Sequence, residues 1–109
     1  MVNKPVIFVY VVKPNEDLLK EICAGMEEEG MLFEIVTKVA LDIETLCFES
    51  ANDSILGSGI GVNGNEIGFS LRSLPKGKLV YTYKNPTSIQ ARNLGANAAR
   101  GVKRLPFKE

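Results

Sequence analysis

The segment Pro5–Val12 (PVIFVYVV) constrains the fold more than any other part of the chain. Its residues are apolar without interruption, and most are β-branched or aromatic, which favours a strand. A strand with one face in water would alternate apolar and polar residues, whereas a continuous apolar run indicates burial on both faces. Because such burial requires cover on each side of the sheet, the sequence predicts an α/β fold.

The next stretch completes a strand–helix–strand unit. A turn at Lys13–Asn15 leads into a helix that begins at Asn15 or Glu16 and ends at Glu29, with Gly30 as its stop signal. Leu32–Lys38 is the second strand, and the spacing predicts that it lies parallel to the first. The apolar positions that recur at helical spacing form the inner face of the helix: Leu18, Leu19, Ile22, Cys23 and Met26.

The second half of the chain contains a hairpin. Asn63-Gly64 is the strongest short-range hairpin signal, so the strands on its two sides should run antiparallel. The expected elements are a helix over Ile43–Ala51 capped by Asp42, strands over Ile55–Val62, Glu66–Leu71 and Leu79–Tyr83, and a last helix from Pro86 or Ser88 to about Lys103. Together these elements predict a single domain over residues 1–109, a three-layer α/β/α sandwich with a mixed five-stranded sheet.

The last helix has small residues on its expected inner face. Gly95 lies mid-helix, where glycine costs about 1 kcal/mol relative to alanine, so we expect it to allow a close approach of the helix to the sheet. The residues expected on this inner face are Ile89, Ala91, Leu94, Gly95, Ala98 and Val102.

Composition excludes several classes of function. Thirteen basic and thirteen acidic residues cancel, which gives no reason to expect a nucleic acid or an anionic membrane as a partner. No apolar run approaches the ~20 residues that cross a membrane, and Met1–Pro5 leads into a strand without the apolar region of an export signal. We therefore expect a cytoplasmic protein. Histidine is absent and no arrangement for nucleophilic catalysis is visible, so we expect a non-catalytic chain.

Two other motifs have structural explanations. Cys23 and Cys47 are too few for a zinc site, and we expect them to be ordinary buried thiols on the apolar faces of their helices. Gly59–Gly64 matches the dinucleotide pattern G-x-G-x-x-G, but that motif needs a helix directly after it, and here a turn and a strand follow. We expect its glycines to let a neighbouring backbone or a partner subunit approach the strand closely.

The end of the first helix is acidic. The carboxylates of Glu27–Glu29 lie at the negative end of the helix dipole, which is unfavourable for them, and they also repel one another. A nearby cation or a basic partner surface would offset this, and a solvated acidic helix end is the alternative.

The last helix has a basic edge, formed by Arg92, Arg100, Lys103 and Arg104. Asn93, Asn97 and Arg100 lie on one stripe of it, at spacings of four and seven residues. From the residues alone this stripe indicates a solvated polar face, and a subunit-docking surface is the alternative.

Three runs of sequence resemble one family. Arg92–Phe107 (RNLGANAARGVKRLPF) is similar to the signature R-N-x-G-x-N-A-A-R-x-V-K-x-x-P-F near the end of small subunits of diol/glycerol dehydratase-reactivating factors. Residues 25–30 (GMEEEG), followed by Phe33, resemble the family's run G-I-E-E-E-G-I-P-F. Ser54–Gly61 (SILGSGIG) is a looser match to a strand rich in small residues.

The resemblance implies both a fold and a function. The fold would be anticodon-binding-domain-like, with strand order 2-1-3-4-5 and the fourth strand antiparallel. The function would be that of the small subunit of an ATP-dependent, chaperone-like factor, which releases damaged cobalamin from B12-dependent diol or glycerol dehydratase by subunit exchange. The resemblance leaves open which of these two dehydratases is the client, and whether the protein associates with a bacterial microcompartment.

The resemblance also implies partners and cofactors. The partner would be a large actin/Hsp70-like ATPase subunit, in a hetero-oligomer with two copies of each subunit, and the dehydratase would be the client. Mg2+ and ADP or ATP would lie in the large subunit and cobalamin in the client, with no cofactor on this chain alone. Two alternatives remain: a relative of the medium subunit of a cobalamin-dependent dehydratase, and a small-ligand-binding α/β module.

Site residues follow from the matched motifs. In the family, a glutamate of the acidic run reaches across the interface and helps to hold a magnesium ion in the large subunit. The matching position is Glu28, and Glu27 takes this role if the register differs by one. Asn93, Asn97 and Arg100 match the C-terminal signature residue by residue, and we expect them at the partner interface together with Glu27.

Overall fold

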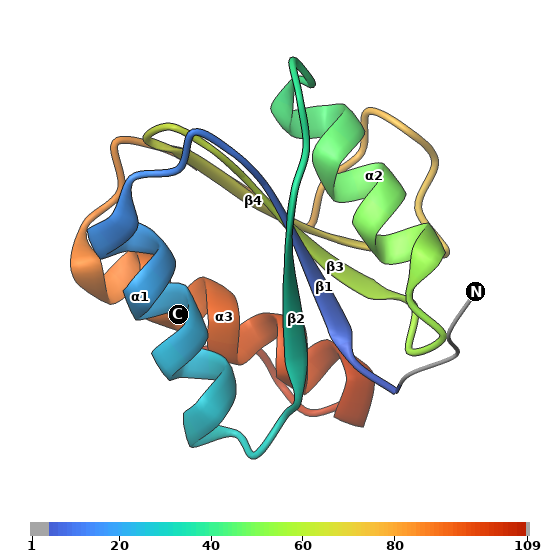
Figure 1. Ribbon diagram of the computed structural model, residues 1–109. Helices are drawn as coiled ribbons and strands as arrows, with labels where there is room; N and C mark the ends of the chain where they lie inside the picture. Colours follow the sequence, from blue (N-terminus) through green and yellow to red (C-terminus); the bar gives the residue numbers. More distant parts are fainter. Residues whose placement is uncertain (1–4, 109) are drawn as a thin grey trace.

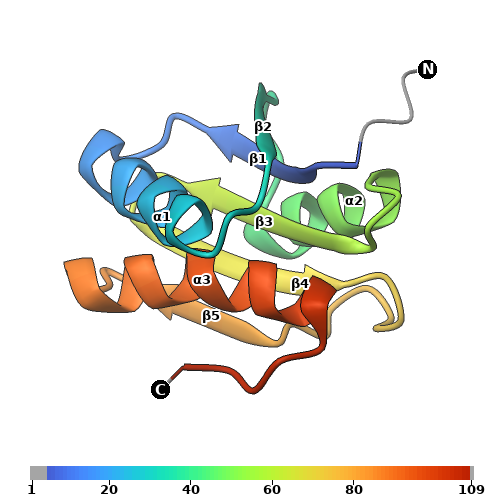
Figure 2. The same ribbon diagram turned by 90° about the horizontal axis from the view of Figure 1, so that it is seen from below.

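A computed structural model describes residues 5–108 of the chain and shows three layers (Figure 1). A five-stranded sheet lies in the middle, with α1 and α3 on one face and α2 on the other (Figures 1 and 2). Met1–Lys4, part of the segment in which no export signal was seen, lie outside the described residues. The elements are β1 (Ile7–Val12), α1 (Glu16–Glu28), β2 (Phe33–Thr37), α2 (Ile43–Asp53), β3 (Ser58–Asn63), β4 (Glu66–Leu71), β5 (Tyr81–Lys84) and α3 (Ser88–Lys103).

The sheet has the predicted topology. Its order is β2-β1-β3-β4-β5, with β1 parallel to β2 and β3. β4 is antiparallel to both of its neighbours, and Asn63 pairs with Glu66 across the predicted hairpin turn. Gly64 has φ of 59° in this turn, a left-handed conformation that glycine adopts without steric cost. None of the described helices is long and apolar enough to cross a membrane.

β3 begins three residues later than predicted, at Ser58 instead of Ile55. The preceding residues form a turn in which the buried Ser54 hydroxyl donates to the carbonyl of Val6 at 2.6 Å and accepts from the amide of Leu56 at 3.1 Å. Local side-chain hydrogen bonds of this kind compete with strand pairing. β5 likewise begins at Tyr81, two residues after the predicted start.

Glycines of the sheet lie directly beneath α2. A Cβ atom on Gly59 would stand 2.2 Å from the amide nitrogen of Ala51, and one on Gly61 would stand 2.8 Å from Cβ of Leu46. Only glycine permits helix and strand to approach so closely. The G-x-G-x-x-G pattern therefore serves packing within the chain, and the element that follows it is β4 and not a helix.

A second close approach joins α1 to α3, and it corrects the expectation for Gly95. A Cβ atom on Gly95 would lie 2.0 Å from the carbonyl oxygen of Ile22, so Gly95 faces α1 and not the sheet. Gly25 makes the reciprocal contact, 2.0 Å from the carbonyl oxygen of Arg92. We call this line of contact the α1–α3 seam.

The prediction that Ile89 lies on the inner face of α3 is wrong, because its side chain is 73% exposed. Residues two apart on a helix point about 200° apart. Ile89 therefore faces away from the buried Ala91 and shares its side of the helix with Arg92 and Asn93.

Candidate functional site

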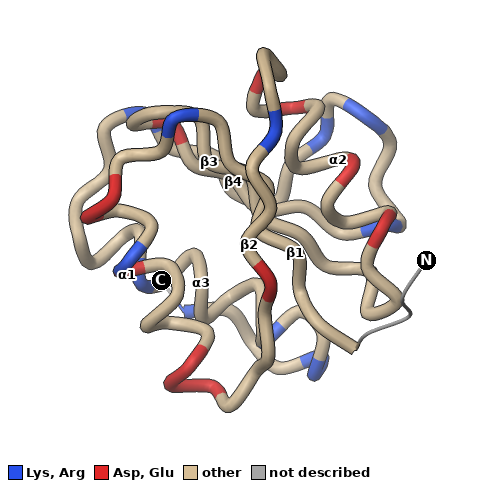
Figure 3. The backbone as a smooth tube through the Cα atoms, in the orientation of Figure 1, with Lys and Arg blue, Asp and Glu red and all other residues tan. Residues whose placement is uncertain are grey.

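The acidic end of α1 obtains its counter-charges from another helix. α1 has no basic residue in its last turn, and Figure 3 shows the acidic residues that gather there. The two helices begin at the same end of the seam, so α3 brings three cations alongside: Arg92, Arg100 and Lys103. The sequence left open whether a cation, a basic partner surface or solvent offsets this charge, and the structure supplies cations from within the chain.

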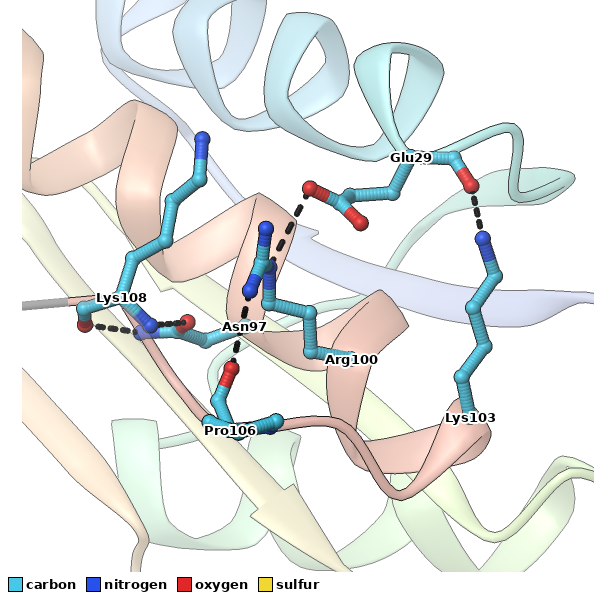
Figure 4. A network of polar contacts seen from close by, with 6 residues as sticks. All are labelled: Glu29, Asn97, Arg100, Lys103, Pro106 and Lys108. Carbon is cyan, nitrogen blue, oxygen red and sulfur yellow. Dashed lines mark hydrogen bonds and ion pairs between the residues drawn. The ribbon is translucent and has the colours of Figure 1, made fainter.

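Glu29 is held by two of these cations. Arg100 Nε donates to Glu29 Oε2 at 3.2 Å, and Lys103 Nζ donates to the backbone carbonyl of Glu29 (Figure 4). The Glu29 side chain is only 13% exposed. Its carboxylate is thus committed to contacts within the chain.

Glu27 and Glu28 remain on the surface. The Glu28 side chain is 48% exposed, and Arg92 Nη1 contacts its Oε2 at 3.4 Å. Arg92 is anchored more firmly on Glu21, at 2.8 Å. Among residues 5–108 no three acidic or cysteine side chains converge to hold a metal ion, so this region can offer a single carboxylate to a metal that other groups complete.

Asn97 and Arg100 bind the segment that follows α3. Asn97 is buried, its Nδ2 donates to the carbonyl of Lys108 at 3.0 Å, and its Oδ1 accepts from the Lys108 amide at 2.6 Å. Arg100 Nη1 donates to the carbonyl of Pro106 at 3.0 Å (Figure 4). Two members of the predicted docking stripe therefore bind the C-terminal segment. The third, Asn93, is half-buried nearer the start of α3. A role of the stripe towards a partner stays a prediction.

Residues 105–108 form a C-terminal strap that returns along α3. Arg104 begins the reversal with φ of 58°. Phe107 then packs edge-on against Phe69 and Tyr81, with ring centroids 5.8 Å apart in each pair. Sequence reasoning missed this strap, although the Asn97, Arg100 and Pro106–Phe107 positions of the matched signature all take part in it.

Burial raises the pKa values of the two cysteine thiols. Cys47 is buried, as predicted, and burial raises the pKa of its thiol to about 12. Cys23 is half-buried, and burial, with a smaller contribution from Glu27, raises its pKa to about 11. Because the thiolate is the nucleophile, the raised pKa values disfavour reaction of both thiols at neutral pH.

Comparison with known proteins identifies the family. The sequence profile of the family described as dehydratase medium subunit matches residues 4–108. The propanediol dehydratase-reactivating factor small subunit of Salmonella typhimurium is 33% identical over 108 residues, which cover 98% of this chain and 93% of that protein. This chain belongs to the dehydratase-reactivating factor small subunits.

Other proteins of this family are similar to the chain in sequence and in structure. The diol dehydratase-reactivating factor small subunit of Klebsiella michiganensis is 31% identical, covering 98% of this chain and 86% of that protein. A solved structure of diol dehydratase-reactivating factor complexed with ADP and Mg2+ contains a chain that matches with a TM-score of 0.91 at 30% identity, covering 97% of this chain and 99% of that one. A glycerol dehydratase reactivase matches with the same score, also at 30% identity, covering 97% of this chain and 98% of that one. The family expected from three short runs is therefore confirmed across nearly the whole chain, and a small subunit implies a larger partner.

Proposed function

We propose that this chain is the exchangeable, non-catalytic small subunit of an ATP-dependent factor that frees B12-dependent diol or glycerol dehydratase of damaged cobalamin. The observation that carries the proposal is the match at a TM-score of 0.91 over 97% of this chain to a reactivating factor chain. A large actin/Hsp70-like subunit would supply the ATPase activity, and both would act in the cytoplasm on the dehydratase as client.

Subunit exchange is supported by a family that includes proteins of two kinds, dehydratase medium subunits and small subunits of reactivating factors. The matching profile is that of a dehydratase medium subunit, whereas the similar proteins are small subunits of reactivating factors. One fold would thus serve in the client and in the factor, which supports a large subunit that binds either of them. Exchange requires two interfaces of similar affinity, which nucleotide state can then tip by the ~1–3 kcal/mol typical of coupling between sites.

Glu28 is the proposed contact to the nucleotide site. Mg2+ usually keeps several waters and binds one or two carboxylates together with substrate phosphates. The exposed Glu28 carboxylate suits the role of one such ligand offered across an interface, and a related factor was solved with ADP and Mg2+. When bound, the ion would neutralise phosphate charge. Glu28 would thereby make the affinity of this chain depend on the nucleotide.

Co-purification tests the proposed function. A tagged copy is co-expressed with the ATPase-like large subunit and analysed by size-exclusion chromatography in ADP or ATP, before and after dehydratase is added. We expect a stable hetero-oligomer that releases this chain when dehydratase is added in ADP. A chain that ignores both proteins would refute the proposal.

Glu28→Gln tests the metal contact. We expect the Mg2+ concentration for half-maximal assembly to rise about tenfold, equivalent to about 1.4 kcal/mol, because the amide keeps the shape of the side chain and loses its charge. Glu27→Gln is the matched control and should leave this concentration unchanged. A shift in the control alone would move the role to Glu27, and no shift in either variant would exclude a carboxylate from this run.

A further inference from the structure

We propose that Arg100 is a positioning residue for the metal-binding carboxylate, acting through Glu29 and the C-terminal strap. This inference rests on the proposed role of Glu28. Arg100 lies on α3, apart from the carboxylate that would meet the metal, and its expected role was contact with a partner. Its contacts in the structure are with the end of α1 and with the strap.

Arg100 joins three segments of the chain at one point. Its Nε donates to Glu29 Oε2 at 3.2 Å, while its Nη1 donates to the Pro106 carbonyl at 3.0 Å (Figure 4). The side chains are largely screened from water, at 26% exposed for Arg100 and 13% for Glu29. A guanidinium is planar and rigid, so it makes both contacts only when the end of α1 and the strap keep a fixed separation.

The strap keeps Arg100 from swinging into solvent. Asn97 bonds both the amide and the carbonyl of Lys108, which fixes the backbone on one side of Phe107. The Phe107 ring packs on Phe69 and Tyr81 of the sheet. The Pro106 carbonyl therefore offers Arg100 an anchored acceptor.

Backbone and side-chain contacts together fix the end of α1 around Glu28. The backbone of the last turn is closed by the residues that follow it, since the Gly30 amide donates to the Glu27 carbonyl and the Met31 amide donates to the Met26 carbonyl, each at 3.0 Å. Gly30 follows directly with φ of 71°, so the chain turns away from the helix axis there. The contacts of Arg100 and Lys103 with Glu29 fix the residue next to Glu28. Glu28, whose half-exposed carboxylate contacts Arg92 Nη1 at 3.4 Å, is thus carried on an ordered turn.

A double-mutant cycle separates positioning from simple stabilisation. The large-subunit complex is assembled with Arg100→Gln in the wild-type and in the Glu28→Gln background, and the Mg2+ concentration for half-maximal assembly is measured. We expect Arg100→Gln to raise this concentration about threefold to tenfold with Glu28 present, at or below the lower end of the roughly 10- to 100-fold range for residues behind a metal ligand, because Arg100 acts through Glu29. In the Glu28→Gln background it should have no further effect. A loss of general stability would act equally in both backgrounds.

Three further variants make the test specific. Glu29→Gln should reproduce the effect of Arg100→Gln. Arg100→Lys should bring the Mg2+ concentration for half-maximal assembly part of the way back to the wild-type value, because lysine keeps the charge but lacks the several N–H donors of the guanidinium. Arg104→Gln removes an exposed arginine at the end of the same helix and should change nothing. If Arg100→Gln does not fold, the cycle with Glu29→Gln decides the question.

The outcomes distinguish this inference from the proposed function. Equal shifts in both backgrounds, or no shift for Arg100→Gln and Glu29→Gln while Glu28→Gln shifts, overturn the role of Arg100 and leave that of Glu28 standing. If Glu28→Gln itself has no effect on Mg2+ dependence, both roles fall. If no complex forms at all, the proposed function fails first.

Discussion

Gly95→Ala should destabilise the protein although alanine is the better helix former. The new Cβ atom would stand 2.0 Å from the carbonyl oxygen of Ile22, whereas non-bonded carbon contacts are comfortable at about 3.5 Å. The atom it meets is backbone in the middle of α1, so no side chain can rotate away. The two helices would have to separate by roughly 1.5 Å, judged from the same contact distance.

The expected magnitude combines two opposing effects. Alanine gains about 1 kcal/mol in helix propensity over glycine, and overpacking a tight contact costs about 1–3 kcal/mol and occasionally more. With the upper half of that range for a backbone contact, we expect a net loss of about 1–2 kcal/mol. This corresponds to a fall in melting temperature of roughly 5–10 °C for a domain of this size.

Urea unfolding followed by circular dichroism is the suitable assay, since the chain has no tryptophan. The midpoint should fall while the denaturant dependence stays constant. Gly101→Ala is the matched control: it is the same change on the same helix, and its nearest neighbours are the side-chain ends of Phe69 and Leu71, at 3.1 and 3.3 Å. The control should be close to neutral. A gain in stability for Gly95→Ala would refute the idea that the α1–α3 seam is a backbone contact.

Gly25→Ala adds an internal check. Its Cβ atom would also stand 2.0 Å from backbone, at the carbonyl oxygen of Arg92. Once one alanine has separated the helices, the second meets less resistance, so the double variant should lose less stability than the sum of the two single variants. Deviations from additivity of ~0.5 kcal/mol or more are expected for residues in one contact.

Two further predictions concern buried groups. Burial and the 2.5 Å hydrogen bond to Asp53 raise the pKa of Tyr10. Tyr10→Phe should therefore lower the free energy of unfolding by about 1 kcal/mol, as measured by urea denaturation, and an unchanged value would mean that the bond contributes nothing. The raised pKa of Cys47, about 12 in the folded state, predicts alkaline destabilisation, because an unfolded thiol releases its proton near about 8.5. The contribution is complete below that pH and is lost as pH rises towards the folded pKa. Between pH 7.5 and 9.5 the free energy of unfolding should therefore fall by about 1.4 kcal/mol through this thiol. Cys47→Ala should remove that part of the pH dependence, and identical pH profiles for the two proteins would contradict the reasoning.

The layers and the antiparallel hairpin could be predicted because they depend on strong local signals, whereas the order of the strands came from the family resemblance. The uninterrupted apolar run of β1 and the Asn63-Gly64 turn each favour one arrangement over its alternatives. The start of β3 could not be predicted, since Ile55 has strand propensity and the turn before β3 combines local bonds to Ser54 with the tertiary bond from Ser54 to Val6. Ile89 is a different case. Helical geometry alone sets it opposite Ala91, so its exposure was available from the sequence.

The candidate site was predictable only in part. Sequence similarity pointed to Glu27 and Glu28, and both lie on the surface. The charge-pairing of the acidic run with α3 could not be foreseen, because it depends on the two helices lying side by side. Asn97 is polar and matches a signature position, which suggested exposure. Asn97 can be buried because the backbone of Lys108, in the C-terminal strap, makes hydrogen bonds to both polar atoms of its side-chain amide.

The α1–α3 seam has a consequence for how the chain reaches its fold. The salt bridge between Glu21 and Arg92 joins residues 71 positions apart, and contacts of such long sequence separation form late and slow the folding rate. During synthesis, α1 leaves the ribosome long before α3 exists, so the fully buried Ile22 and Met26 of the final structure stay uncovered until nearly the whole chain is made. Folding to completion therefore waits for the last helix. A chain released before Lys103 would expose an apolar face on α1 and become a target for aggregation or degradation.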